Sequence, residues 1–123
     1  GPEVRIKWPN DLLIDVRKLG GILVETTPER AICGVGINLT WAPGGAAKLE
    51  RPRDEVLERL RAKVDEWTVA PPSRMLARWR ELSATLGRRV RIDSTEGIAE
   101  DIGSDGELIV DGRAYIAGSV THL

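Results

Sequence analysis

A polar pair, a lysine and two pairs of glycines in the first third of the chain are the residues best suited to hold a ligand. Asn10-Asp11 supplies an amide and a carboxylate just past a strand-like run, although the same pair commonly forms a backbone turn. Lys18 precedes Gly20-Gly21, where adjacent glycines permit either positive φ or the close approach of a ligand. Gly34 and Gly36 alternate, so they share one face of a strand. A flat ligand or a neighbouring helix would fit on that bare face.

Short apolar runs predict the strands that carry these groups. Val4 to Lys7 alternates apolar and charged residues, which predicts a strand with one buried face. Leu12 to Ile14 is a second short apolar run, followed by a predicted charged turn at Asp15 to Lys18. Ile22 to Glu25 and Ala31 to Leu39 are two further strands. Because a short polar turn joins them, we predict an antiparallel hairpin.

Two amphipathic helices are predicted between residues 52 and 87. Pro52 suits the first turn of the first helix. Pro71-Pro72 ends the link to the second helix, for which Ser73 is the predicted N-cap and Gly87 the predicted stop. We expect both apolar stripes to pack in the core. They comprise Val56, Leu57, Leu60, Val64 and Trp67 in the first helix, and Met75, Leu76, Trp79, Leu82 and Leu86 in the second.

From Arg88 onward the pattern changes to short strands separated by turns. Asp111-Gly112 lies between apolar runs, which is typical of a hairpin. Several short strands in so short a segment predict a small barrel or curled sheet. The predicted strands are Val90–Asp93, Ile98–Ile102, Leu108–Val110, Ala114–Ile116 and Ser119–Thr121. We therefore predict an α+β fold with one unit at residues 1–87 and a second, all-β unit at residues 88–123.

Composition and charge limit the classes of function that this chain could have. Of the 123 residues, 41% are apolar and 30% charged, as in ordinary globular proteins. A net charge of −1 gives no general attraction to nucleic acid or anionic membranes. Cys33 is the only cysteine, so a reducing, cytoplasmic compartment is the default, and its apolar surroundings predict a buried side chain. No apolar run approaches the roughly 20 residues of a membrane span. The cluster at residues 88–91 fits a strand with its arginines facing solvent.

Three segments resemble the biotin–protein ligase family in their order and spacing. They are Lys7-Trp8-Pro9-Asn10-Asp11, then Arg17-Lys18-Leu19-Gly20-Gly21-Ile22-Leu23-Val24-Glu25, then Gly34-Val35-Gly36-Ile37-Asn38-Leu39. Two helices followed by a small SH3-like β domain also match the way members of this family end. The resemblance implies part of a catalytic domain, with a partial mixed or antiparallel sheet and two helices, followed by a small SH3-like β-barrel.

The resemblance implies a two-step reaction. The biotin carboxylate attacks the α-phosphate of ATP, which gives biotinyl-adenylate and pyrophosphate. A lysine in the biotin carboxyl carrier domain of a carboxylase then attacks the acyl carbon. Negative charge gathers on oxygens in both transition states, so fixed positive charge and hydrogen-bond donors are needed. Mg²⁺ bridging the ATP phosphates is expected, and no residue is assigned as a metal ligand.

Residue roles follow from the positions that match the family motifs. Lys18 matches the lysine that reaches the biotin carboxylate and the α-phosphate oxygens, although a loop lysine by itself is usually solvated. Asn10 and Asp11 match positions around the adenylate and the metal. Lys7 would assist with phosphate charge or face solvent.

Three further positions complete this set. Gly21 would lend its backbone to the biotin pocket. Asn38 matches a position near the adenine, where an amide offers both a donor and an acceptor. Trp8 fits either a pocket wall or ordinary core. The family often ends with an arginine that helps to hold ATP, whereas this sequence ends at His122-Leu123.

The family's upstream Gly-Arg-Gly-Arg-type loop is not found in this sequence, so the chain resembles the C-terminal part of a ligase. We expect little or no ligase activity from the chain alone, and an exposed sheet edge that favours a homodimer. The alternative hypothesis is a non-catalytic binding module derived from the same fold. A lipoate or octanoate ligase agrees less well with the Lys-Trp-Pro-Asn-Asp block. A repressor role would require an N-terminal DNA-binding domain.

Overall fold

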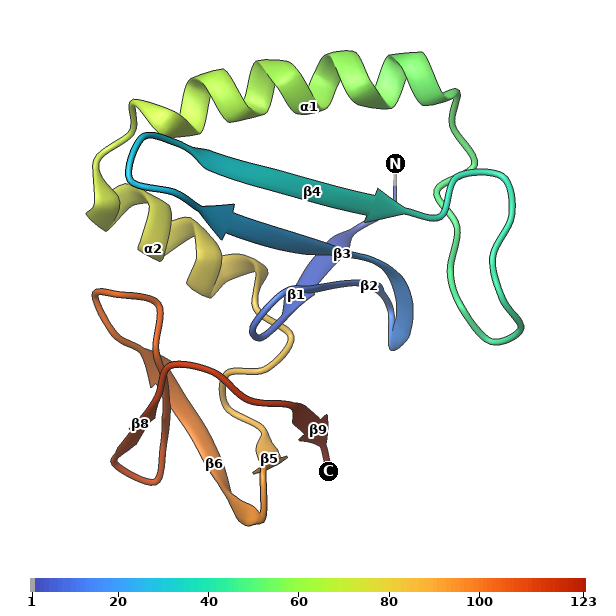
Figure 1. Ribbon diagram of the computed structural model, residues 1–123. Coiled ribbons are helices and arrows are strands. Elements are labelled where there is room, and N and C mark those ends of the chain that lie inside the picture. The colour runs from blue at the N-terminus through green and yellow to red at the C-terminus, as the bar shows by residue number, and fades with distance from the viewer. Residues whose placement is uncertain (1) are drawn as a thin grey trace.

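The computed structural model describes residues 2–123, which form two antiparallel sheets and two helices (Figure 1). The predicted α+β fold is therefore confirmed, and the first sheet is antiparallel throughout rather than mixed. That sheet has the strand order β1-β2-β3-β4. Its strands are β1 (Val4–Lys7), β2 (Asp11–Ile14), β3 (Arg17–Thr26) and β4 (Ala31–Ile37).

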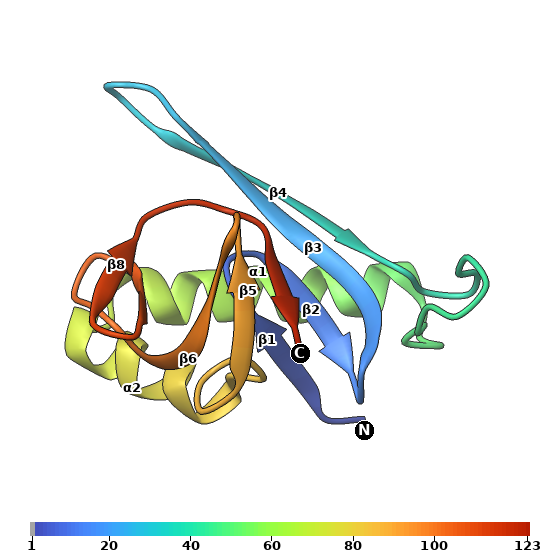
Figure 2. The same ribbon diagram turned by 90° about the horizontal axis from the view of Figure 1, so that it is seen from below.

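The predicted hairpin is the long β3–β4 pair, which projects beyond the rest of the molecule in Figure 2. The predicted charged turn at Asp15 to Lys18 is shorter in the structure. Only Asp15 and Val16 form the turn, with Asp15 at φ 54°, because Arg17 and Lys18 already pair with β2. Lys18 is therefore a strand residue, which matters for its position in the site.

The helices are α1 (Arg53–Thr68) and α2 (Pro72–Leu82). Pro52 is the N-cap of α1 and lies just outside its first turn. Both predicted ends of α2 are wrong. The helix begins at Pro72 rather than after Ser73, since proline needs no partner for an N–H group at a helix start. It ends at Leu82, because Ser83 takes up extended geometry and pairs with Ile6 of β1.

The second sheet has the strand order β8-β7-β6-β5-β9. The last strand of the chain, β9, therefore pairs with β5, which is the first of these five strands in the sequence. All its pairings are antiparallel, and the Asp111-Gly112 turn joins β7 to β8 with both residues at positive φ, as the Asp-Gly signal predicts. On the outer face of this sheet, Glu96 forms ion pairs with Arg89 and Arg91. The strands are β5 (Arg89–Ile92), β6 (Thr95–Ile102), β7 (Leu108–Val110), β8 (Arg113–Tyr115) and β9 (Val120–His122).

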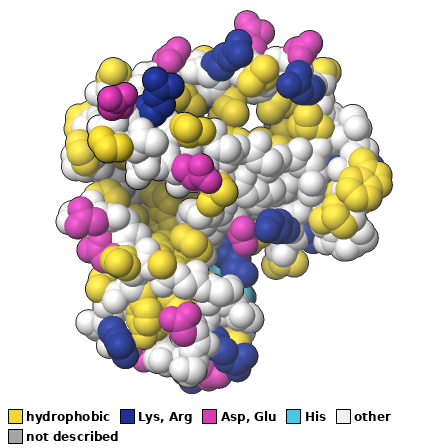
Figure 3. Space-filling model, viewed as in Figure 1, with side chains coloured by type: hydrophobic (Ala, Val, Ile, Leu, Met, Phe, Trp, Pro, Cys, Tyr) yellow, Lys and Arg dark blue, Asp and Glu magenta, His cyan; other side chains and the backbone are white. Residues whose placement is uncertain are grey.

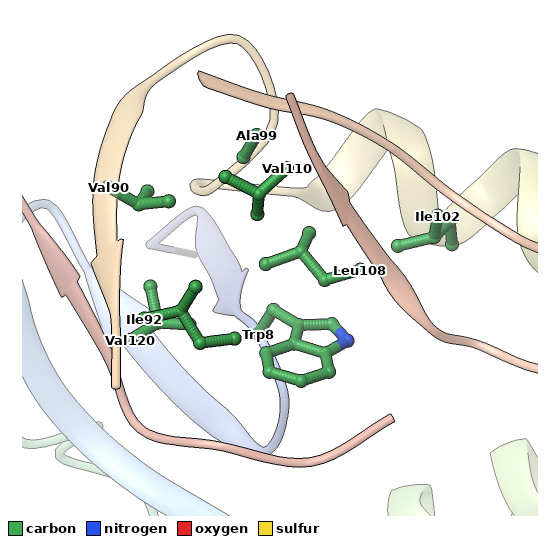
Figure 4. Packing of buried hydrophobic residues seen from close by; sticks show 8 residues of the cluster. All are labelled: Trp8, Val90, Ile92, Ala99, Ile102, Leu108, Val110 and Val120. Atoms are coloured by element: carbon green, nitrogen blue, oxygen red, sulfur yellow. The ribbon is translucent and has the colours of Figure 1, made fainter. Parts of the chain in front are cut away.

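Trp8 is a core residue of this second sheet, although it comes from the end of β1 (Figure 4). Its side chain packs among apolar residues of the five strands, and its Nε1–H donates to the Gly106 carbonyl at 2.9 Å. The other buried members of this cluster are Val90, Ile92, Ala99, Ile102, Leu108, Val110 and Val120. The two predicted units thus share a buried side chain, and the boundary near Gly87 stays a prediction.

Cys33 is exposed on β4, which contradicts the prediction that it is buried. The apolar residues beside it, Val24 and Ile32, are exposed as well. The strand is an edge of the sheet, and no described element covers this part of the hairpin. No helix within residues 2–123 is both long and apolar enough to cross a membrane.

Candidate functional site

Four residues from the motifs of the candidate site lie in one row of paired positions across the first sheet. Lys7 pairs with Asp11, Asp11 with Gly21, and Gly21 with Gly36. Directly paired residues of an antiparallel sheet project to the same face. The sheet therefore places a cation, a carboxylate and two bare backbone positions side by side.

A groove of about 450 Å³ lies over this part of the sheet. Asn10 and Asp11 line one end, and Gly21, Gly34 and Gly36 leave its floor without side chains. Figure 3 shows the corresponding surface of β3 and β4 as largely white, which marks backbone and uncharged polar atoms. Ile22, Leu23 and Val35 complete the lining. We call this the glycine groove.

Lys18 reaches the same face through an irregularity in the sheet. Strict alternation along β3 would place the Lys18 side chain on the opposite face of the sheet from Gly21, because the two residues are an odd number of positions apart. The β2–β3 register shifts between Leu12 and Leu13, so Lys18 pairs with Leu13. Such shifts commonly re-aim a side chain. The Lys18 Nζ consequently lies 3.4 Å from the Asp11 carboxylate.

Gly20 is required where β3 passes closest to β4. A Cβ atom at this position would overlap the Gly36 carbonyl oxygen. By contrast, a Cβ at Gly36 would meet no atom within 4 Å, because it would point into the open groove. Gly20 therefore serves strand packing, whereas Gly36 keeps the floor of the groove free.

Asn10 uses its backbone and its side chain for different purposes. Its carbonyl accepts a hydrogen bond from the Ile22 N–H at 2.9 Å, which fixes the Trp8–Asn10 turn to β3. Its side chain is exposed and lies at the end of the groove. Asn10 therefore belongs to a turn, as predicted, and its contact with an adenylate stays a prediction.

Asn38 is not part of the groove lining. Its Nδ2 donates to the Ala47 carbonyl at 3.0 Å, and the Ala47 N–H donates to the Lys18 carbonyl at 2.9 Å. Ala47 is almost fully buried between them. Asn38 therefore holds the irregular segment 40–50 against β3, and its contact with the adenine stays a prediction.

The arrangement suits an elongated anionic ligand with a flat part. Bare backbone would lie under the flat part, and the Lys18 ammonium would face negative charge. Among residues 2–123, no three His, Cys, Asp or Glu side chains come together as metal ligands. Asp11 is the carboxylate at the groove, and it already pairs with Lys18.

One buried polar contact beside the site was not predicted. Thr85, from the segment between α2 and β5, accepts the Trp8 N–H and also contacts His122. A threonine after a helix carries no sequence signal for such a role. The contact appears only because Trp8 packs into the second sheet.

Comparisons with known proteins agree with the three motifs. The model of the biotin/lipoate A/B protein ligase family matches residues 1–40. A biotin–[acetyl-CoA-carboxylase] ligase of Mycobacterium tuberculosis is 37% identical over 98% of this chain and 54% of its own length. The bifunctional ligase/repressor BirA of Escherichia coli is 28% identical over 89% of this chain and 42% of its own length. The chain thus spans about half the length of these curated relatives.

Solved structures show the same fold. The apo biotin protein ligase of Aquifex aeolicus superposes with a TM-score of 0.79 over 98% of this chain and 65% of its own, at 19% identity. The same enzyme in complex with biotin and ATP gives a TM-score of 0.77, covering 98% of this chain and 62% of its own at 19% identity. Because the motif order, the family model and the curated relatives agree, the chain belongs to the biotin protein ligase family.

Proposed function

We propose that this chain carries the lysine-bearing side of a site that activates biotin with ATP and transfers it to a lysine of a carboxyl carrier domain. The observation that carries the proposal is the Lys18–Asp11 pair at the glycine groove. The sheet register and the β2–β3 irregularity together place a lysine beside a groove with a bare floor. Two of the relatives are named biotin–[acetyl-CoA-carboxylase] ligases, which supports the proposal.

In the first step, an oxygen of the biotin carboxylate forms a bond to the α-phosphorus of ATP. The bond from that phosphorus to the oxygen bridging to the β-phosphate breaks, and pyrophosphate leaves. Lys18 would lie between the carboxylate and the α-phosphate oxygens and stabilise the charge that they gather. Asp11 would hold the ammonium in place before the substrates arrive. Lys7, in the same row, would add positive charge near the phosphates.

In the second step, the carrier lysine attacks the acyl carbon of the adenylate, loses a proton and releases AMP. The floor formed by Gly21 and Gly36 would support the biotin moiety without a side chain between ligand and backbone. Mg²⁺ would arrive with the ATP phosphates, since this cation commonly keeps several waters and needs few protein ligands. Asn10 and Asn38 would contact the adenylate.

Calorimetric titration of a non-hydrolysable biotinyl-adenylate analogue into the chain tests this proposal. We expect binding in the micromolar range, equivalent to roughly 8 kcal/mol. Lys18→Ala should weaken that binding by about tenfold or more, because a charge-assisted contact to the ligand is lost. Stability should change little, since the Lys18 side chain is 60% exposed.

Lys48→Ala is the matched control, because Lys48 pairs with Glu50 outside the glycine groove. The control should bind the analogue like the unmodified chain. Equal binding by Lys18→Ala would contradict the role of Lys18. A chain that circular dichroism shows to be folded, yet binds no analogue, would instead favour the non-catalytic binding module.

A further inference from the structure

The segment at residues 83–87, between α2 and β5, joins the two sheets by polar contacts. The Ala84 N–H donates to the Ile6 carbonyl at 2.7 Å, and Arg5 donates to the Ser83 carbonyl at 2.6 Å. The Gly87 N–H donates to the Ala99 carbonyl in the second sheet at 2.7 Å. This segment therefore holds β1 on one side and β6 on the other. We call it the joint segment.

Thr85 is the most deeply buried polar residue of the joint segment, with no solvent exposure. Its Oγ1 lies 3.0 Å from the Trp8 backbone nitrogen, which donates to it. The same oxygen lies 3.0 Å from Nε2 of His122 on β9. One hydroxyl thus connects the end of β1 with the last strand of the second sheet.

These contacts use the hydroxyl of Thr85 both as an acceptor and as a donor. Burial and the nearby Arg88 and Lys7 cations lower the pKa of His122 to about 4, so the imidazole is neutral at pH 7. The Thr85 oxygen already accepts the Trp8 N–H. With a neutral ring protonated on Nδ1, the hydroxyl donates its own proton to Nε2.

The contact leads directly to the glycine groove. Trp8 is two residues before Asn10, whose carbonyl accepts the Ile22 N–H and whose side chain lines the groove. The next residue, Asp11, pairs with Lys18. A fixed Trp8 backbone therefore fixes the turn that presents Asn10 and Asp11.

We propose that Thr85 is a positioning residue, whose buried hydroxyl uses the second sheet to hold the Trp8–Asp11 turn in its ligand-binding geometry. The inference rests on the proposed function for its effect on ligand binding. Its structural part, the coupling between Thr85 and the turn, stands independently of any ligand. Sites that are loosely supported lose affinity even when their contacting residues are intact.

Thr85→Val and Thr85→Ser test the proposal in the full chain. Valine keeps the shape but leaves the buried Trp8 N–H without an acceptor, whereas serine keeps the hydroxyl. Amide hydrogen exchange measured by NMR should accelerate about tenfold or more at Trp8 and Ile22 in the valine variant, because local opening then costs less free energy. The serine variant should restore slow exchange at both amides.

Val110→Ala is the control for general destabilisation, because Val110 lies in the core of the second sheet on β7. Its loss of stability, measured by urea unfolding, is compared with that of Thr85→Val. At a similar loss of stability, amide exchange at Trp8 and Ile22 should be faster in Thr85→Val than in Val110→Ala. Equal exchange in the two variants would overturn the proposal.

Titration with the biotinyl-adenylate analogue is the second measurement. Thr85→Val should weaken binding by about tenfold, while Thr85→Ser and Val110→Ala stay within about threefold of the unmodified chain. Unchanged affinity of Thr85→Val, in a chain that binds the analogue, would overturn the positioning role. If the unmodified chain binds no analogue, the proposed function fails, and the exchange measurement alone decides the coupling.

Discussion

The two sheets of this protein differ in how completely they bury their apolar residues. The second sheet encloses a cluster in which Val90, Ile92, Ala99 and Leu108 have no exposed surface. In the first sheet, by contrast, Leu23 on the β3–β4 hairpin is 63% exposed. The two helices, α1 and α2, contain no buried residue either. The glycine groove lies on the less covered sheet. The comparison indicates that the second sheet supplies stability, whereas the first supplies an accessible surface.

The sharpest test of this difference is a leucine-to-alanine change in each sheet. Leu108→Ala should lower the free energy of unfolding by about 2–5 kcal/mol, because it opens a cavity in an enclosed core. Leu23→Ala should change it by less than about 0.5 kcal/mol, since most of that side chain already contacts solvent. Urea unfolding followed by circular dichroism measures both. Equal effects would show that the hairpin is as tightly packed as the second sheet.

A smaller effect is expected from two glycine substitutions within the first sheet. Gly20→Ala should destabilise the protein by about 1–3 kcal/mol, because its Cβ would overlap the Gly36 carbonyl. Gly36→Ala should leave stability nearly unchanged while weakening ligand binding, since its methyl group would enter the groove. Thermal unfolding and analogue titration separate these outcomes. A stable Gly20→Ala variant would mean that the strands can move apart.

The third expected effect is a pH dependence located in the second sheet. The pKa of His122 is lowered to about 4 from its usual 6.5, so the unfolded chain binds a proton at higher pH than the folded one. This contribution to stability is complete above pH 6.5 and is lost as the pH falls toward 4. His122 is the only histidine, so His122→Gln should flatten the stability profile between pH 7 and 5.

Parallel urea titrations of the two proteins across that pH interval measure this effect. Asp101 and Glu96, whose pKa values are lowered by arginines, lose their contributions at more acidic pH and should act equally in both proteins. A profile for His122→Gln as steep as that of the unmodified chain would contradict a neutral, half-buried His122.

Local patterns predicted the strands and turns better than they predicted burial. The alternation in residues 4–7, the β3–β4 hairpin and the Asp111-Gly112 turn are all found near the expected positions, because backbone preference decides them. Burial of Cys33 was predicted wrongly, since it depends on which elements cover the strand. The end of α2 was also misplaced. Gly87 does adopt positive φ, but it lies at the end of the joint segment, just before β5, rather than at the end of α2.

The sequence predicted which residues gather at the candidate site, but it did not predict the features that depend on contacts between different elements. Motif spacing indicated that Asn10, Asp11 and Lys18 belong together, and the structure places the three beside one groove. The alternation rule alone would have directed Lys18 to the other face. Register irregularities depend on the pairing of two strands, so one strand's sequence does not reveal them. Thr85 lacked any sequence signal, because its role depends on a tryptophan from another element.

The burial of Trp8 gives the protein an optical reporter. Trp8 is 4% exposed and hydrogen-bonded within the second sheet, whereas Trp41, in the segment beside Lys18, is 73% exposed. Iodide in solution would quench the fluorescence of Trp41 readily and that of Trp8 only when the two sheets separate. Variants that retain one of these indoles would therefore report on different events. Emission from Trp8 would follow the separation of the two sheets at the joint segment, and emission from Trp41 would follow the irregular segment 40–50.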